Sequence, residues 1–237
     1  MTETLLEVRN LFGGYKRGVD VLHDLSFSVS GGEALGMIGL NGSGKSTLGR
    51  ALMNLLPYRS GEVFFDGTSV NCKSTHELCR EGLTMMHQGG AVFPNLSVWE
   101  NLRLASGQQN PIVTERIESL IPLLSRPRTQ LRRMMADKLS EGERHQLALA
   151  MALSANPKLV ILDEPSAGLS PSAVDSMYKL LSEITKSLGT SIILIEQNIT
   201  RAVAFCDRCV LMEGGRLFSD LDNLSLEEIE TKLFKNK

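Results

Sequence analysis

The sequence has few of the features that mark secreted, membrane-spanning or nucleic-acid-binding proteins. No apolar run is long enough to cross a bilayer, and the opening residues MTETLLEV lack the basic and apolar regions of a secretion signal. The 25 Lys and Arg residues nearly cancel the 27 Asp and Glu residues, so no overall positive field is present to hold a polyanion. We therefore expect a chain that stays in the cytosol and has no nucleic-acid partner.

Cysteine is also scarce, with 4 in 237 residues. Cys206 and Cys209 form a Cys-x-x-Cys pair, which in principle could bind zinc together with Cys72 and Cys79. The pair has apolar neighbours and no second Cys-x-x-Cys matches it, so the pattern favours reduced thiols. We expect no metal cage and no disulfide.

What the sequence does contain is a 42% apolar content and strand and helix patterns that alternate along the chain. The runs 5–11 and 21–29 predict two strands of an antiparallel hairpin or edge sheet. A buried strand over 34–40 is followed by a glycine-rich turn and a helix over 46–56, and a further strand is expected over 61–67. These segments predict a strand, loop and helix unit in the first third of the chain.

The rest of the chain divides into a helical middle and a second alternating part. Polar helical patterns over 94–135 predict a helical insertion, and the amphipathic stretch 224–237 predicts a closing helix. Strands and helices then alternate, which argues for a mostly parallel sheet with helices on both faces. The expected elements are strand 159–163, helix 171–188, strand 191–196, a helix after Asn198 and strand 209–215.

The strongest functional signal is GLNGSGKST, which matches the phosphate-binding pattern G-x-x-x-x-G-K-[ST] between a buried strand and a helix. Glycines in such a loop let backbone N–H groups surround phosphate oxygens, the lysine reaches the β and γ phosphates, and the serine after it can hold Mg²⁺. The pattern predicts a nucleoside triphosphate site. Its residues are Gly39, Leu40, Asn41, Gly42, Ser43, Gly44, Lys45, Ser46 and Thr47.

A second signal is LVILDEP, in which a buried strand ends in two acids. Asp163 is placed to hold the Mg²⁺ of a phosphate-loop site, and Glu164 is placed to orient or deprotonate an attacking water. Two adjacent acids alone could equally be a polar turn. The phosphate-binding loop makes the functional interpretation the stronger one.

The third signal is KLSEGERHQLALAMAL, which begins as a capped helix with Ser140 as N-cap and Glu143 three residues later. Gly142 in the first turn favours no helix, which suggests that it lets a ligand approach the backbone. Glu141 beside it is out of place if that ligand is an anion.

Together these motifs resemble the ATP-binding subunits of ABC transporters. LSEGE resembles the family signature, Tyr15 in FGGYKRG resembles the aromatic that stacks on adenine, and Gln88 in MMHQGG resembles the glutamine that senses Mg²⁺ and the membrane partner. Because five motifs occur in the family's order, the resemblance covers nearly the whole chain.

The resemblance implies a fold and a set of partners. The fold class is α/β, a P-loop NTPase core with a mostly parallel sheet, an N-terminal antiparallel β subdomain and an inserted α-helical subdomain. We expect one ABC ATPase domain over 1–237, with the helical subdomain at about 91–150. A complete site would hold ATP and Mg²⁺ between two cassettes, which would act with transmembrane permease subunits on the cytoplasmic side of the bacterial inner membrane.

The resemblance also assigns roles to residues. Glu164, Gln88 and Gln197 would be catalytic; Ser46, Gln88 and Asp163 would hold the metal. Ser140 and Gly142 would contact the ATP bound by the opposite cassette. By residue type alone, Phe93 and Trp99 are expected in the core, although the resemblance places their segment near a groove that receives the transmembrane subunit. A solvated face is expected for arginines 126, 128, 132 and 133, with contact to acidic lipid or a partner as the less favoured alternative.

Departures from the family pattern point to one branch. Most relatives have a histidine where this chain has Gln197. That glutamine and DEPSAGLSP resemble the ATPase subunits of bacterial branched-chain amino acid importers and of related amide or urea importers, in which two different cassettes usually pair and a solute-binding protein delivers the solute. His87 and Gln88 fit that branch less well, and Met151 stands where relatives in general often have arginine. A lipid or lipopolysaccharide exporter ATPase and a soluble ABC ATPase stay as alternatives.

Overall fold

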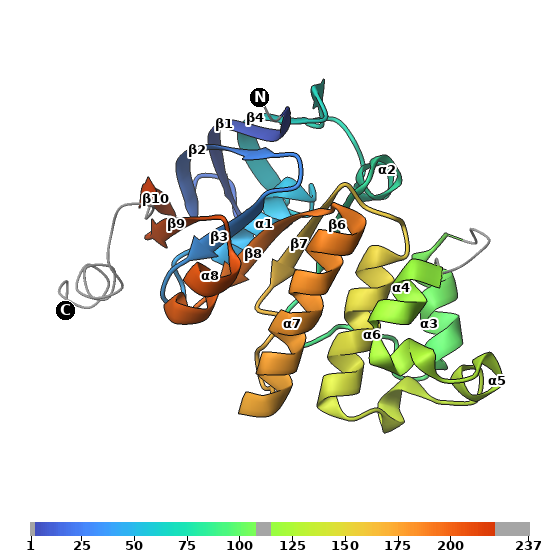
Figure 1. Ribbon diagram of the computed structural model, residues 1–237. Helices are drawn as coiled ribbons and strands as arrows, with labels where there is room; N and C mark the ends of the chain where they lie inside the picture. Colours follow the sequence, from blue (N-terminus) through green and yellow to red (C-terminus); the bar gives the residue numbers. More distant parts are fainter. Residues whose placement is uncertain (1–2, 108–114, 221–237) are drawn as a thin grey trace. The chain divides into compact units, whose positions relative to one another are not determined.

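The structure is a computed structural model that describes residues 3–107 and 115–220, apart from the side chains of residues 116, 219 and 220 (Figure 1). The chain forms two compact units, Met1–Leu78 with Ser191–Lys237 and Cys79–Thr190. The division falls within helix α2 (Thr75–Glu81). The closing helix predicted over 224–237 lies outside the described residues.

The first unit contains an antiparallel sheet with the strand order β2-β1-β4-β5. Leu6, Val8 and Leu11 of β1 are buried, and β1 pairs with β2 in antiparallel register, as the alternating pattern predicts. The strands are β1 (Thr4–Gly14), β2 (Leu22–Ser30), β4 (Tyr58–Phe65) and β5 (Thr68–Ser69).

A second group of strands in this unit is centred on β3 (Ala34–Ile38). It pairs in parallel with β8 (Ser191–Glu196) and β9 (Arg208–Glu213), and β10 (Arg216–Asp220) runs antiparallel to β9. Every residue of β3 and β8 is buried, which explains why both read as continuous apolar runs. The predicted parallel pairing is confirmed; β10 was not predicted.

Two helices complete the first unit. Helix α1 (Lys45–Leu52) follows the phosphate-binding loop, and α8 (Ile199–Phe205) follows β8. The prediction of a helix to residue 56 is too long, because Asn54 has a left-handed backbone, with φ of 54°. The amide N–H of Leu55 then donates to the carbonyl of Arg50 and closes the turn.

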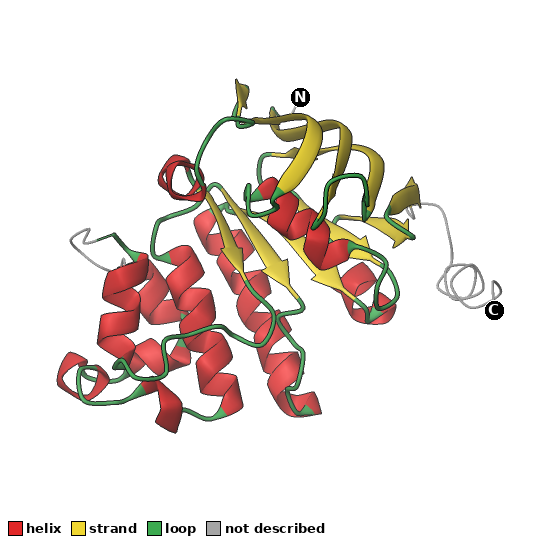
Figure 2. Ribbon diagram, turned by 180° about the vertical axis from the view of Figure 1, so that it is seen from behind, coloured by secondary structure: helices red, strands yellow, loops and turns green. Residues whose placement is uncertain are grey.

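The second unit pairs β6 (Leu83–Met86) in parallel with β7 (Leu159–Asp163) and is otherwise helical (Figure 2). The predictions of strand 159–163 and helix 171–188 are confirmed, whereas α2 and β6 were not predicted. The α-helices of this unit are α3 (Val98–Ala105), α4 (Glu115–Leu120), α5 (Arg128–Leu131), α6 (Glu141–Leu153) and α7 (Pro171–Leu188), and the 3-10 turns are η1 (Pro122–Ser125) and η2 (Ala136–Lys138).

The segment between β6 and α3 is held by Asn101, which is fully buried. Its amide group accepts from the N–H of Phe93 at 2.7 Å and donates to the carbonyls of Phe93 and Ser97 at 3.1 and 2.9 Å. The prediction that Phe93 lies in the core is wrong: its side chain is 52% exposed, because these bonds fix its backbone at the surface. Trp99 is half-buried, with the guanidinium groups of Arg128 and Arg132 5.7 and 5.2 Å from its ring.

Candidate nucleotide site

The phosphate-binding loop leaves β3 at Ile38 and enters α1 at Lys45. Gly42 and Gly44 have φ angles of 80° and 102°, where a side chain would strain the backbone. No atom lies within 4 Å of the position that a Cβ would take on Gly42. The loop therefore presents open backbone at the start of a helix, where the partial positive charge favours an anion.

Lys45 lies beneath this loop and is only 4% exposed. Its Nζ donates to the carbonyls of Gly39 and Leu40 at 2.8 and 2.9 Å. Within the described residues the buried Ser43 hydroxyl has no hydrogen-bond partner. Buried hydroxyl groups usually have a hydrogen-bond partner, and a bound phosphate oxygen would supply one for Ser43.

The turn between β9 and β10 supports the loop from behind. A Cβ on Gly39 would lie 2.2 Å from the carbonyl oxygen of Met212, and the N–H of Gly215 donates to the carbonyl of Ser43 at 2.9 Å. Met212 and Gly215 were not predicted from the sequence as supporting residues. The double glycine at 214–215 was the available signal, because both residues have positive φ.

Two further predicted residues belong to the same unit as the loop. The Tyr15 hydroxyl lies 3.3 Å from the Thr47 hydroxyl and accepts from Arg50 at 2.9 Å, while the Tyr15 side chain is 50% exposed. Gln197 follows β8 and is exposed, and the register pairs Glu196 with Ile38. Gln197, the first residue after β8, therefore lies beside the start of the phosphate-binding loop, which follows Ile38.

The second unit brings together the acids and Gln88. Asp163 at the end of β7 and Glu164 after it are 3% and 8% exposed. Gln88 donates from Nε2 to Oε2 of Glu164 at 2.7 Å. Glu164 also has a φ of 48°, a costly conformation for a residue with a side chain, and such strain concentrates at functional sites.

The signature segment begins α6 as the sequence predicts. Ser140 is the N-cap, its hydroxyl accepts from the N–H of Glu143, and the Glu143 carboxylate accepts from the Ser140 N–H at 2.9 Å. The space beside Gly142 is open to 4 Å. Glu141 turns elsewhere: a Cβ on Gly168 would lie 2.4 Å from Oε1 of Glu141, so this carboxylate lies over Gly168 in the loop after β7.

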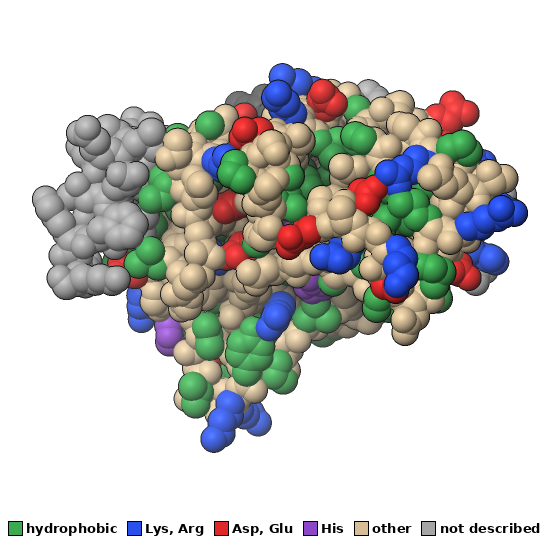
Figure 3. Space-filling model, turned by 90° about the horizontal axis from the view of Figure 1, so that it is seen from below, with side chains coloured by type: hydrophobic (Ala, Val, Ile, Leu, Met, Phe, Trp, Pro, Cys, Tyr) green, Lys and Arg blue, Asp and Glu red, His purple; other side chains and the backbone are tan. Residues whose placement is uncertain are grey.

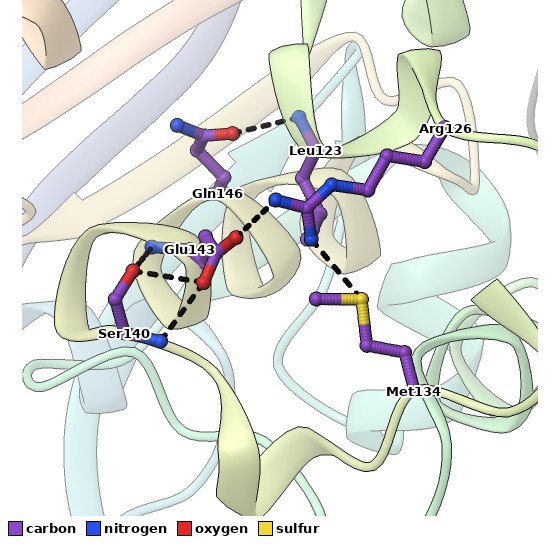
Figure 4. Close-up of polar contacts among 6 residues, drawn as sticks. All are labelled: Leu123, Arg126, Met134, Ser140, Glu143 and Gln146. Carbon is purple, nitrogen blue, oxygen red and sulfur yellow. Dashed lines mark hydrogen bonds and ion pairs between the residues drawn. The ribbon is translucent and has the colours of Figure 1, made fainter. Parts of the chain in front are cut away.

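Figure 4 shows how this helix start is tied to its neighbours. Glu143 pairs with Arg126, which also donates to the sulfur of Met134 at 3.1 Å, and Gln146 accepts from the N–H of Leu123 at 2.9 Å. Arg126 is therefore a structural partner here and not part of a purely solvated face. The backbone hydrogen bond from Ser140 is the main cause that lowers the pKa of Glu143, which stays ionised at neutral pH.

Basic and acidic side chains are interspersed on the face drawn in Figure 3. Among residues 3–107 and 115–220, no helix is long and apolar enough to span a membrane. In the same part of the chain, no group of three His, Cys, Asp or Glu residues could hold a metal ion.

Each unit thus contains part of the site residues predicted from the sequence. The first holds the phosphate-binding loop, Tyr15 and Gln197; the second holds Gln88 with Glu164, Asp163, and the signature residues at the start of α6. These features define a P-loop nucleotide-binding protein of the α/β class.

Comparisons with known proteins identify the family. The family model described as ABC transporter matches residues 22–167, more than half of the chain. The chain is 33% identical to the probable branched-chain amino acid transport ATP-binding protein LivF of Archaeoglobus fulgidus over 94% of both proteins. It is 31% identical to the lipopolysaccharide export system ATP-binding protein LptB of Escherichia coli K12, over 90% of this chain and 89% of LptB.

The fold agrees with that result. The solved structure of cbiO1 from Clostridium perfringens matches with a TM-score of 0.80 and 28% identity, covering 97% of this chain and 94% of that one. The chain belongs to the ABC transporter family and is an ATP-binding, ATP-hydrolysing subunit of a transporter. Cassettes of this family work as dimers with membrane permease components.

Proposed function

We propose that this subunit energises a membrane importer for branched-chain amino acids or related small amides. The observation that carries the proposal is Gln197, which directly follows β8 and resembles the glutamine of the importer branch at a place where most relatives of the family have histidine. The similarity to LivF over 94% of the chain supports it. The similarity to LptB supports a second candidate, the ATPase of a lipid or lipopolysaccharide exporter.

The residues present fit ATP and Mg²⁺. Lys45 and the backbone of residues 39–47 would hold the phosphates, and the buried Ser43 hydroxyl would gain its missing partner. Tyr15, half exposed next to Thr47, would stack on the adenine. Mg²⁺ prefers oxygen ligands, which the Ser46 hydroxyl, the Asp163 carboxylate and the Gln88 amide can supply.

Mg²⁺ would stabilise the charge that develops on the transferred phosphate. Glu164 would accept a proton from the attacking water or orient it, and Gln88, already bonded to Glu164, would hold that carboxylate in position. The Gln197 amide would position the γ-phosphate by donating a hydrogen bond. This contact would stay uncharged, because an amide does not titrate in the physiological range.

A complete site would need a second cassette. Ser140 and the open Gly142 lie at the start of α6, where the helix N-terminus favours a phosphate carried by the opposite subunit. We propose one ABC domain over 1–237, with residues 91–150 as its helical subdomain. A different cassette is the expected partner, by analogy with the importer branch, and the pair would lie against permease subunits on the cytoplasmic side of the bacterial inner membrane, supplied by a solute-binding protein.

The decisive experiment is to co-purify this subunit with its membrane partners and measure ATP hydrolysis in liposomes. We expect leucine, isoleucine or valine, with the binding protein, to stimulate hydrolysis. A Glu164→Gln variant is the matched control and should assemble normally but lose turnover. Stimulation by a lipid or lipopolysaccharide instead would favour the exporter. Mass analysis of the purified complex distinguishes two different cassettes from two copies of this chain.

A further inference from the structure

Cys206 and Cys209 come together at a position that none of the ATPase chemistry uses. Cys206 directly follows α8 with an extended backbone, and Cys209 is the second residue of β9. Both sulfurs lie over Gly36 in β3: a Cβ on that glycine would be 2.7 Å from Sγ of Cys209 and 3.1 Å from Sγ of Cys206. The two thiols therefore share the space that any side chain at position 36 would fill.

The two residues between the cysteines form hydrogen bonds to Ala34, the first residue of β3, and to Glu33 before it. Asp207 donates its N–H to the carbonyl of Ala34 at 2.9 Å and accepts the Ala34 N–H on its carboxylate at 2.8 Å. Arg208 donates to the Glu33 carboxylate at 3.0 Å. These hydrogen bonds hold the backbone between the two cysteines in place before any reaction of the thiols.

The thiols also contact each other. A hydrogen bond to Cys209 and burial raise the pKa of the Cys206 thiol, and the charges of Asp207 and Glu196 add to the shift. The raised pKa keeps the Cys206 thiol protonated at neutral pH. Cys209 is buried and Cys206 is only partly buried, so a small reagent would reach the pair from the Cys206 side.

We propose that Cys206 and Cys209 form a redox modification site that closes to a disulfide. With a low-molecular-weight disulfide such as oxidised glutathione, Cys206 loses its proton and attacks one sulfur of the reagent; a mixed disulfide forms, and the other half of the reagent leaves as a thiolate that takes up a proton. The second sulfur then attacks the protein sulfur of that mixed disulfide, and the second thiol leaves. The protein loses two electrons and two protons, and the S–S bond of the reagent is reduced to two thiols.

The geometry favours the second step. The attacking sulfur is already beside the mixed disulfide, so little chain entropy is lost on closure. Neither cysteine forms a disulfide in the structure described. The disulfide would form only on oxidation, and it would close a covalent link at the start of β9, the strand whose Met212 carbonyl lies against Gly39.

The test uses the full-length protein, incubated to equilibrium with oxidised glutathione or with dithiothreitol. Remaining thiols are alkylated, and the protein is digested with trypsin without reduction. Arg208 lies between the cysteines, so cleavage separates 202–208 from 209–216. We expect the two peptides to be linked, two hydrogens lighter than their sum, with loss of both alkylatable thiols.

Matched variants define the result. In Cys209→Ser the Cys206 thiol should carry glutathione, and in Cys206→Ser the buried Cys209 should stay largely unmodified. Neither variant should form the linked peptide, whereas Cys72→Ser with Cys79→Ser should leave the linkage unchanged. The proposal is overturned if the wild-type protein, folded by circular dichroism, yields the two peptides separately alkylated or separately glutathionylated. Since that outcome concerns the unmutated chain, it does not depend on whether a variant folds. It also does not depend on which solute is transported.

Discussion

Replacing Glu141 by glutamine tests how the signature segment meets a phosphate. A carboxylate about 4 Å from a phosphate charge would oppose its approach by about 1 kcal/mol in water and about 4 kcal/mol at an effective dielectric constant of about 20. Since every 1.4 kcal/mol is about tenfold in an equilibrium constant, removing that charge would strengthen ATP-dependent pairing by about fivefold to a thousandfold per site.

The structure predicts a much smaller effect. The Glu141 carboxylate lies over Gly168, and the space beside Gly142 is open. If turning toward Gly168 doubles the separation from the phosphate to about 8 Å, with water between, the same repulsion falls to about 0.5 kcal/mol and is further screened by salt. We therefore expect Glu141→Gln to change the dimerisation constant by less than about threefold.

The assay is sedimentation of the Glu164→Gln protein with ATP, run both alone and mixed with the different cassette proposed above, so that hydrolysis does not consume the dimer. Gly168→Ala supplies the control, because its new Cβ would lie 2.4 Å from Oε1 of Glu141 and displace the carboxylate. That variant also has φ of 81° at an alanine, a local cost of about 1 to 2 kcal/mol. A gain of more than about tenfold for Glu141→Gln alone would refute the reasoning.

Three further outcomes follow from the same contacts. Gly39→Ala should lower stability by about 1 to 3 kcal/mol and weaken ATP binding, because its Cβ would meet the Met212 carbonyl at 2.2 Å; unchanged thermal unfolding and unchanged nucleotide titration would contradict this. Gln197→Ala should slow ATP turnover while ATP binding is nearly kept, and equal turnover would exclude a role in positioning. The pKa of Glu143 is lowered from 4.5, chiefly by the backbone hydrogen bond from Ser140, so its stabilising effect is present above pH 4.5 and is lost as pH falls through the lower folded value. Glu143→Gln should weaken the pH dependence of the free energy of unfolding below pH 4.5, and an unaltered pH dependence would contradict a stabilising role of the Glu143 carboxylate.

Much of the fold follows from local pattern. Strands 159–163 and 191–196 were predicted with the bounds observed, because a strand buried on both faces leaves a continuous apolar run. Helix 171–188 was predicted with Pro171 at its start, and in the structure Gly189, with φ of 67°, ends it. The short elements β6, β10 and α2 were missed because their few residues carry too little periodicity.

The sequence by itself determined the motifs: the phosphate-binding loop, the acids after β7, and the capped start of α6, since each depends on residue types at fixed short spacings. Only the tertiary structure decided which distant groups meet. Strand register places the Met212 carbonyl behind Gly39 and both thiols over Gly36, and packing within the second unit brings Gln88 to Glu164. The direction of Glu141 was decided in the same way. Its charge is visible in the sequence, but only the path of the loop after β7 shows that Gly168 leaves room for it.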